Sequence, residues 1–381
     1  MNVKTLALLL AACVLFACSS NKDKEELKRS GLVDFDDTVK IKRDWSKGLG
    51  DGRDKRASNL QLAVDGTVVY GADVEGRVYA YDYESKKRLW KVRLDDEISA
   101  AVGLGRNQIY LGTFKGELIA LDSATGEELW RAKTSSEILG VPVGSRRVAV
   151  AQTIDGRLFG FSTRDGEQLW RYDHAVPALT LRGTANPVLS RNQLFAAFAN
   201  GQVVSLNVGD GALLWSGRVS SPRGRHDLEK MVDIDGTPVV DGGLVYAATY
   251  QGALASFSKA KGQVVWKQDL SSYRDLTVDG RYVYAVTEES HLVAFDVANG
   301  SIAWTNDQMQ LRGLDSPLAL GNYVLVVDDD SYLHVINKSD GSFAGRRKLK
   351  GGEYNAPFIK LGERFMTFSG DGKLGIYRLS E

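Results

Sequence analysis

One short frame of residues recurs along most of the chain, and it limits the folds that the chain can adopt. The frame reads Gly-x-Leu-x-Ala-Leu-Asp, then three residues, a glycine, three residues and a tryptophan, as in residues 116–130. Further copies, one of them with Ser290 in the first glycine position, occupy residues 76–90, 156–170, 201–215, 252–266 and 290–304. The tryptophans are spaced by roughly 40 to 50 residues, a period found in propellers and solenoids.

The two ends of the chain carry complementary halves of one repeat. A seventh copy, residues 331–345, has Gly345 where the others have tryptophan, and an eighth begins at Gly372 and stops before its tryptophan position. Near the other end, residues 41–45 close with Trp45 and have no front half of their own. A linear solenoid is expected to carry polar caps at both ends, so complementary halves favour a closed ring.

Each copy has the pattern of four short strands. Within residues 118–122, leucine, alanine and aspartate recur with a period of two, which is typical of a strand with one face inward. The Asp-x-x-x-Gly piece is typical of a turn, and two more short strands, 100–104 and 108–112, precede it. We therefore predict an all-β fold, an eight-bladed β-propeller of four-stranded antiparallel blades over residues 40–381, with the last blade completed by the N-terminal strand. We interpret the tryptophans as packing residues between blades.

The N-terminal segment has the pattern of an export signal followed by a lipid attachment site. Residues 1–17 combine Lys4, an apolar run too short to span a bilayer as a helix, and a small residue before Cys18. The tetrad that ends in Cys18 resembles the bacterial lipobox, which implies cleavage before that cysteine and its acylation. Ser19 in the next position is, by the same resemblance, expected for sorting to the outer membrane. We interpret residues 18–39, which are polar and charged, as the lipidated cysteine and a flexible tether.

Composition argues against several classes of function. The 48 basic and 48 acidic residues balance to zero net charge, unlike a protein that captures nucleic acid through its phosphates. The 4 histidines lack the paired spacing of a zinc site, and no cysteine follows Cys18. Asp328 to Asp330 are expected to form a solvated turn rather than a calcium site. We identify no catalytic residues and expect no metal or cofactor.

The repeat frame resembles that of quinoprotein dehydrogenases, whose blades carry an Ala-x-Asp-x-x-x-Gly-x-x-x-Trp signature. The resemblance implies the fold, while such enzymes also carry a vicinal cysteine pair, a tryptophan beneath the cofactor and a calcium site. Here the 2 cysteines are confined to Cys13 and Cys18, and every tryptophan belongs to the repeat frame. A quinoprotein dehydrogenase and a periplasmic carbohydrate-binding propeller remain the two alternatives to a scaffold.

Two neighbouring connections, residues 171–187 and 216–238, break the regularity of the repeat. Both join an outer strand to the next inner strand, so we expect them to emerge side by side on one face of the disc. The first contains Leu179, Leu181 and Arg182, and apolar residues beside an arginine in a long loop are typical of a protein-binding hot spot. In the alternative interpretation, the two leucines begin the next blade's inner strand and are buried there.

Five features together, the lipobox, the tether, the eight repeats, Leu-Thr-Leu-Arg-Gly at 179–183 and Asp-Ile-Asp-Gly-Thr-Pro-Val at 233–239, resemble the BamB family of the β-barrel assembly machinery. That resemblance implies a non-enzymatic scaffold lipoprotein at the periplasmic face of the outer membrane. It implies binding to the periplasmic POTRA domains of the barrel subunit BamA, and to the rest of the assembly complex, and a role in folding and inserting outer-membrane proteins. By matching position it assigns the partner contacts to Leu179, Leu181, Arg182, Asp233 and Asp235. A further role, binding of unfolded barrel strands by the outermost strand of each blade, follows from the general logic of strand addition.

Overall fold

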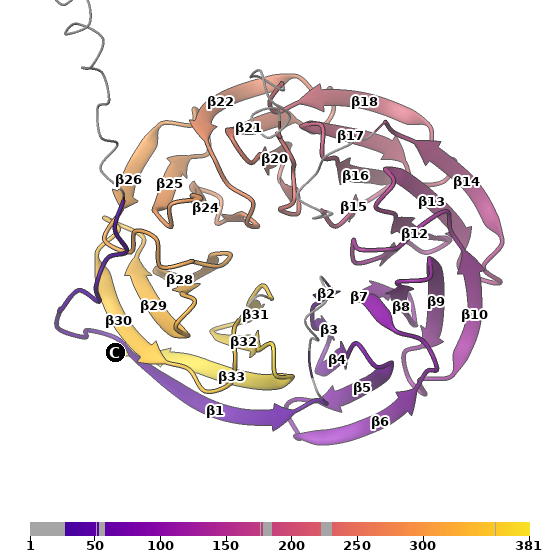
Figure 1. The fold of residues 1–381 in the computed structure, drawn as a ribbon, viewed down its shortest axis with the longest axis horizontal. Helices are drawn as coiled ribbons and strands as arrows, with labels where there is room; N and C mark the ends of the chain where they lie inside the picture. The colour runs from indigo at the N-terminus through magenta and orange to yellow at the C-terminus, as the bar shows by residue number, and fades with distance from the viewer. Residues whose placement is uncertain are drawn as a thin grey trace, which may run out of the picture.

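The computed structural model describes residues 27–50, 52, 58–175, 177, 185–221, 231–354 and 356–381. It is a ring of eight sheets arranged around a central axis like the blades of a propeller (Figure 1). Each blade has four antiparallel strands, and the described residues form no helix. Within that part of the chain, no helix of the length and apolarity needed to cross a membrane is present. The predicted all-β, eight-bladed propeller is therefore confirmed.

The strands of each blade follow one another from the centre of the ring to its rim. Blade 1 contains β3 (Ala63–Asp65), β4 (Val68–Ala72), β5 (Arg77–Asp82) and β6 (Lys87–Arg93). Blade 2 contains β7 (Ile98–Gly105), β8 (Gln108–Thr113), β9 (Glu117–Asp122) and β10 (Glu128–Lys133), with the short β2 (Asn59–Leu60) added in parallel beside β7. Blade 3 contains β11 (Val143–Gly144), β12 (Val148–Gln152), β13 (Arg157–Ser162) and β14 (Gln168–Asp173). Blade 4 contains β15 (Val188–Ser190), β16 (Gln193–Ala197), β17 (Gln202–Asn207) and β18 (Leu213–Arg218).

The second half of the ring repeats this order. Blade 5 contains β19 (Val239–Asp241), β20 (Leu244–Ala248), β21 (Gly252–Ser258) and β22 (Val264–Leu270). Blade 6 contains β23 (Thr277–Val278), β24 (Tyr282–Val286), β25 (Leu292–Asp296) and β26 (Ile302–Asn306). Blade 7 contains β27 (Leu318–Leu320), β28 (Tyr323–Val327), β29 (Tyr332–Asn337) and β30 (Phe343–Lys348). Blade 8 contains β31 (Ile359–Leu361), β32 (Arg364–Phe368), β33 (Lys373–Ser380) and, as its outer strand, β1 (Lys40–Gly48).

The antiparallel order of each blade gives the disc two different faces. We call one the connection face, because it carries the connections from each outer strand to the next inner strand. The turns between the second and third strands lie on that face as well. The opposite hairpin face carries the turns between the first and second strands and between the third and fourth. A segment's place in the repeat therefore assigns it to a face.

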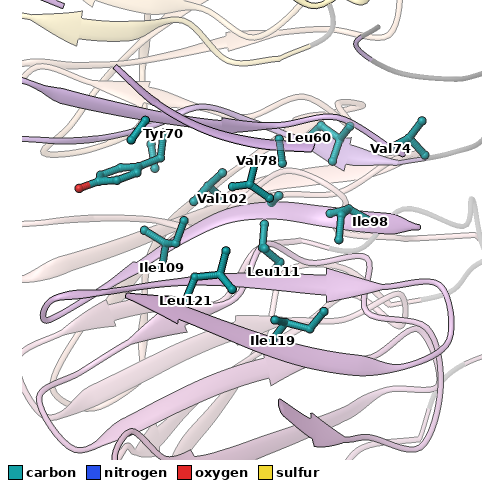
Figure 2. Close-up of a cluster of buried hydrophobic side chains, with 14 of the residues drawn as sticks. Leu60, Tyr70, Val74, Val78, Ile98, Val102, Ile109, Leu111, Ile119 and Leu121 are labelled. Atoms are coloured by element: carbon teal, nitrogen blue, oxygen red, sulfur yellow. The ribbon is translucent and has the colours of Figure 1, made fainter. Parts of the chain in front are cut away.

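Apolar side chains fill the layers between adjacent blades. The middle strands are buried on both faces, as in β8, where Ile109 and Tyr110 point to opposite faces and neither has exposed surface. Figure 2 shows the layer between blades 1 and 2, where Val78 of β5 and Ile98 of β7 pack in one cluster with Leu60 of β2. Burial of apolar surface contributes about 25 cal/mol per Å². These layers between the blades hold the ring together.

The ring closes by pairing the two ends of the propeller. β1 runs antiparallel to β33, from Lys40 opposite Ser380 to Gly48 opposite Lys373. Figure 1 shows β1 outside β33 at the rim. The N-terminal strand therefore completes the last blade, as predicted, and closure leaves no unpaired sheet edge between the first and last repeats.

The tryptophans join neighbouring blades near the rim. The indole N–H of Trp170 in β14 donates to the carbonyl of Val208 in blade 4 over 2.9 Å. Its ring covers Gly211, whose φ is +72° and where an added Cβ would lie 2.7 Å from the ring. The same indole bond and the same cover over a glycine of the next blade recur for Trp90, Trp130, Trp215, Trp266 and Trp304. On β1, Trp45 contacts Tyr81 of blade 1, with ring centroids 6.3 Å apart. The interpretation of the tryptophans as packing residues between blades is confirmed.

Blade 7 departs from this scheme. At its tryptophan position, an added Cβ on Gly345 would lie 2.3 Å from the carbonyl oxygen of Val39. Residues 29–39, which the sequence assigns to the tether, lie along the outside of β30 (Figure 1). Thr38 and Val39 both donate their backbone N–H to the carbonyl of Ala344 over 2.9 Å. The N-terminal chain therefore covers the place of the missing indole.

A buried charged group lies behind this segment. Asp328 is 3% exposed, accepts a hydrogen bond from Nε of Arg312 over 2.8 Å, and lies 3.1 Å from Nε2 of His334. Burial alone would raise the pKa of Asp328, but hydrogen bonds from His334, the Tyr332 N–H and Arg312 outweigh it and lower that pKa. The interpretation of this turn as solvated is wrong for Asp328, because the connection before β27 brings Arg312 onto its carboxylate.

Candidate functional site

The two long connections rise from neighbouring places on the connection face. The first joins β14 to β15 and the second joins β18 to β19, so they stand on either side of blade 4. At their roots, the side-chain amide of Asn186 donates to the hydroxyl of Thr237 over 3.1 Å. The predicted placement side by side on one face is confirmed for the described ends of both connections.

Four of the predicted functional residues lie outside the residues that the structure describes. They are the contact residues Leu179, Leu181 and Arg182 in the first connection and the acylation site Cys18. The described inner strand of blade 4, β15, begins at Val188. The roles of these four residues therefore stay predictions.

Asp233 lies in the buried base of the second connection. The segment from Met231 to Ile234 is almost fully covered, and Asp233 has no exposed surface. Ile234 packs in the cluster that includes Trp215 and joins blades 4 and 5. The backbone carbonyl of Asp233 accepts the N–H of Tyr250 over 2.9 Å. This burial suits Asp233 to position the connection rather than to touch a partner directly.

Asp235 lies nearer the surface and has an unusual proton affinity. Burial, and secondly the negative charge of Asp233, raise the pKa of Asp235 to about 7. Its Oδ1 atom has no hydrogen-bond partner among the described residues. A carboxyl group that changes charge near neutral pH, and whose Oδ1 accepts no hydrogen bond from the described residues, is suited to bind a cationic group.

Two further aspartates, which the sequence analysis did not single out, continue this arrangement. The backbone N–H of Thr237 donates to Oδ1 of Asp275 over 2.6 Å, and the Asp275 N–H donates to the Ser316 hydroxyl over 3.1 Å. Burial is the main cause of a raised pKa at Asp275, and Asp315 pairs with Arg274 at 3.2 Å. The sequence contains a pattern that identifies them, because an aspartate precedes the inner strand of each of blades 5, 6 and 7. These side chains tie the root of the second connection to the next two blades.

The first connection is fixed at its other end by an aromatic stack. His174, directly after β14, stacks on Phe198 with ring centroids 3.9 Å apart. Nε2 of His174 lies 2.8 Å from the amide nitrogen of Asn200. Burial lowers the pKa of His174, and the charge of Arg218 acts in the same direction. The ring is therefore neutral at pH 7 and accepts the Asn200 N–H at Nε2.

A cavity of about 650 Å³ opens among the inner strands of blades 8, 1, 2 and 3, beside the root of the first connection. Asn186 and Pro187 are part of its lining, and apart from Tyr83 and Lys360 the lining is apolar or carries neutral amides. Among the described residues, no group of three histidine, cysteine or acidic side chains is placed to hold a metal ion. The described lining of the cavity contains no acidic side chain and no histidine.

Comparison with known proteins agrees with this architecture. The family model described as outer membrane protein assembly factor BamB matches residues 74–306. The outer membrane protein assembly factor BamB of Pseudomonas aeruginosa is 42% identical over 376 residues, which cover 99% of this chain and 99% of that protein.

Solved structures agree as well. The crystal structure of BamB from Moraxella catarrhalis superposes with a TM-score of 0.82 at 28% identity, covering 89% of this chain and 99% of that one. A europium-containing methanol dehydrogenase superposes with a TM-score of 0.72 at 12% identity, covering 89% of this chain and 93% of that one, a likeness of fold alone. The family model and the relative that matches end to end leave one assignment: this chain belongs to the BamB family of outer membrane protein assembly factors.

Proposed function

We propose that this protein is a non-enzymatic scaffold of the outer-membrane β-barrel assembly complex. It is anchored to the periplasmic face of the outer membrane through acylated Cys18 and binds the periplasmic POTRA domains of a BamA-like barrel subunit. In that position it assists the folding and insertion of outer-membrane proteins. Confinement to the membrane raises the effective concentration of scaffold and partner, so a contact of moderate affinity suffices.

The observation that carries this proposal is the pair of long connections rooted side by side on a rigid disc. The bond between Asn186 and Thr237 joins their bases, and the buried Asp233 segment fixes the second one. A pre-organised base lowers the entropy lost on binding. We assign direct contact to Leu179, Leu181 and Arg182, with Asp235 receiving a partner cation and Asp233 positioning the loop.

The test is affinity purification of the full-length lipoprotein from detergent-solubilised envelopes, followed by identification of what travels with it. We expect Leu179→Ala with Arg182→Ala to lose the barrel subunit while the thermal transition stays unchanged. The matched control is Leu169→Ala with Arg164→Ala, because both residues are exposed on blade 3 and Arg164 lies on the hairpin face. Unchanged co-purification by the first variant would remove the assignment.

Unfolded barrel strands are a further proposed partner. The outer strand of each blade has only one neighbour within its sheet, and strand addition to such an edge supplies backbone hydrogen bonds. On β18 and β22 the apolar residues Leu213, Leu214, Val264 and Val265 are each about half exposed. We expect a peptide with alternating apolar residues to be cross-linked to these strands, and labelling spread evenly over the disc would remove this role.

A quinone cofactor does not fit the residues of this ring. The resemblance to quinoprotein dehydrogenases implies a tryptophan beneath the cofactor, whereas all 7 tryptophans here lie on outer strands, Trp45 on β1 among them. These indoles are already used in packing against the next blade. This placement supports the scaffold over the dehydrogenase.

A further inference from the structure

Residues 29–39, which we call the strap, start from the hairpin face of the disc. β33 begins at the turn that follows β32, on the connection face, and therefore ends at Ser380 on the hairpin face. Lys40, the first residue of β1, pairs with Ser380. Without the strap, the chain leading to the N-terminus would leave the propeller on the hairpin face.

The strap crosses the rim of blade 7 along β30. At the hairpin end, Thr38 and Val39 are bonded to the carbonyl of Ala344. Further along, the carboxylate of Asp37 accepts the N–H of Arg346 over 3.1 Å, and the Arg346 guanidinium donates to the carbonyl of Val33 over 2.8 Å. These contacts lie along β30 between Ala344 and Arg346.

An aromatic stack holds the middle of the strap. The ring of Phe35 lies on the ring of Phe343, with centroids 5.0 Å apart and planes inclined by 17°. The guanidinium of Arg346 lies 4.7 Å from the centroid of Phe35. Stacked aromatic pairs and cation–π contacts of this kind are both stabilising. The middle contact is therefore specific to these side chains.

The strap ends on the connection face. Arg29 pairs with Asp329 and, at 2.6 Å, with Asp330, both in the turn between β28 and β29. The N–H of Ser30 donates to the carbonyl of Gln310, in the connection before β27, over 3.0 Å. The buried Arg312 of the same connection donates to the carbonyl of Ser30 over 3.2 Å. The two segments that this end of the strap contacts, the turn between β28 and β29 and the connection before β27, both lie on the connection face.

We propose that the strap selects the face of the disc that is held toward a lipid surface. By crossing blade 7, it moves the exit of the membrane anchor from the hairpin face to the connection face. This inference rests on the proposed acylation of Cys18. With the strap in place, residues 19–28 reach at most ~40 Å from Arg29, whereas a released chain reaches ~75 Å from Lys40. The connection face, with its two long connections, is thereby kept near the membrane.

Fluorescence quenching in vesicles tests the proposal with the full-length acylated protein. The mature chain has no cysteine except Cys18, so an engineered thiol is a unique labelling site. We place a fluorophore at Glu289→Cys, in the turn between β24 and β25 on the connection face, or at Asn299→Cys, in the turn between β25 and β26 on the hairpin face. The vesicles contain phosphatidylethanolamine and phosphatidylglycerol with a nitroxide-labelled lipid. We expect stronger quenching at position 289 than at position 299.

A strap-release variant and a matched control complete the experiment. Arg29→Ala with Phe35→Ala removes the salt bridges and the stack, and we expect the quenching difference between the two labels to be lost. Lys28→Ala with Leu32→Ala removes the same kinds of side chain from exposed neighbouring positions, and we expect the difference to remain.

The outcomes separate the two proposals. Equal quenching at both labels in the unmodified protein, or a difference that survives strap release, would overturn the orientation while leaving the anchor intact. Failure of every form to float with the vesicles would overturn the anchor, and with it this inference. Hydrogen exchange at Thr38 and Val39 checks that the release variant frees the strap while the blades stay protected.

Discussion

The junction between blades 7 and 8 and the six junctions before it join neighbouring blades by different means. In the six regular junctions, a tryptophan covers a glycine in the next blade and its indole bonds to a nearby carbonyl, as Trp304 does with Gly341 and Lys338. At the seventh, Gly345 makes room for the backbone of Val39, and the strap covers the blade. The glycine turn that an indole would cover is missing in blade 8, because its third and fourth strands, β33 and β1, come from opposite ends of the propeller and no turn joins them.

The difference shows how a repeat changes where the ring is closed. In a regular junction, the tryptophan and the glycine that it covers both belong to the repeat frame, so the same contact occurs six times. The closing junction must use the chain's two ends, and two positions of blade 7 differ there from every other copy of the repeat. Gly345 stands where the other copies have tryptophan, and Phe343 stands where they have no aromatic residue. This junction therefore combines closure with control over the path of the N-terminal chain.

Removing one indole should have the largest effect on this comparison. Trp170→Ala leaves a cavity at a regular junction and is expected to cost about 3–5 kcal/mol of unfolding free energy, measured by urea denaturation. Leu169→Ala, next to it but half exposed, is the control and should change stability by less than about 0.5 kcal/mol. Equal effects would mean that the indole does not join the blades.

Restoring the indole at the closing junction should be harmful rather than stabilising. In Gly345→Trp the first side-chain carbon alone would lie 2.3 Å from the Val39 carbonyl oxygen. We expect a loss of about 1–3 kcal/mol from overpacking, together with faster hydrogen exchange at Thr38 and Val39. A gain in stability with an undisturbed strap would contradict the account.

The stack between Phe35 and Phe343 should account for a smaller share. A double-mutant cycle with Phe35→Ala and Phe343→Ala is expected to give a coupling energy of about 1 kcal/mol. The matched apolar truncation in the strap, Leu32→Ala, removes an exposed side chain and should show no coupling to Phe343→Ala. Additive effects of the two phenylalanine changes would show that the stack does not hold the strap.

Acidification should destabilise blade 7, where His334 is buried beside Asp328. Burial is the main cause that lowers the pKa of His334. The charges of Arg346 and Arg312 lower this pKa further, while Asp328 acts in the opposite direction. Below the unfolded-state pKa of about 6.5, the unfolded chain binds a proton that the folded chain does not, so stability falls as the pH drops. We expect His334→Gln to flatten the slope of stability between pH 7 and pH 5, and an unchanged slope would contradict this role.

The repeat made most of the fold predictable from the sequence. The spacing of glycine and tryptophan set the number of blades, and the complementary ends at Trp45 and Gly372 predicted the pairing of β1 with β33. The strap was not predictable in this way. Its charged residues suggest a tether, and partners such as Arg346 and Asp329 lie about 300 residues away in the sequence.

The candidate site was predictable in part. Connection length located both loops, and the topology placed them on one face. Burial of Asp233 depends on packing between blades 4 and 5, which no local pattern reports. The buried Asp328 was misread for the same reason, since its partner Arg312 comes from a connection outside the repeat frame. The aspartates before β23 and β27 were predictable from their recurrence.

Site-specific photo-crosslinking in intact envelopes tests most directly whether the connection face is the docking face. A photoreactive residue is placed at Pro177, in the first long connection, or at Asp165, in the turn between β13 and β14 on the hairpin face; both positions are exposed. The account predicts an adduct with the barrel subunit from position 177 and none from position 165. An adduct from position 165 alone would contradict it.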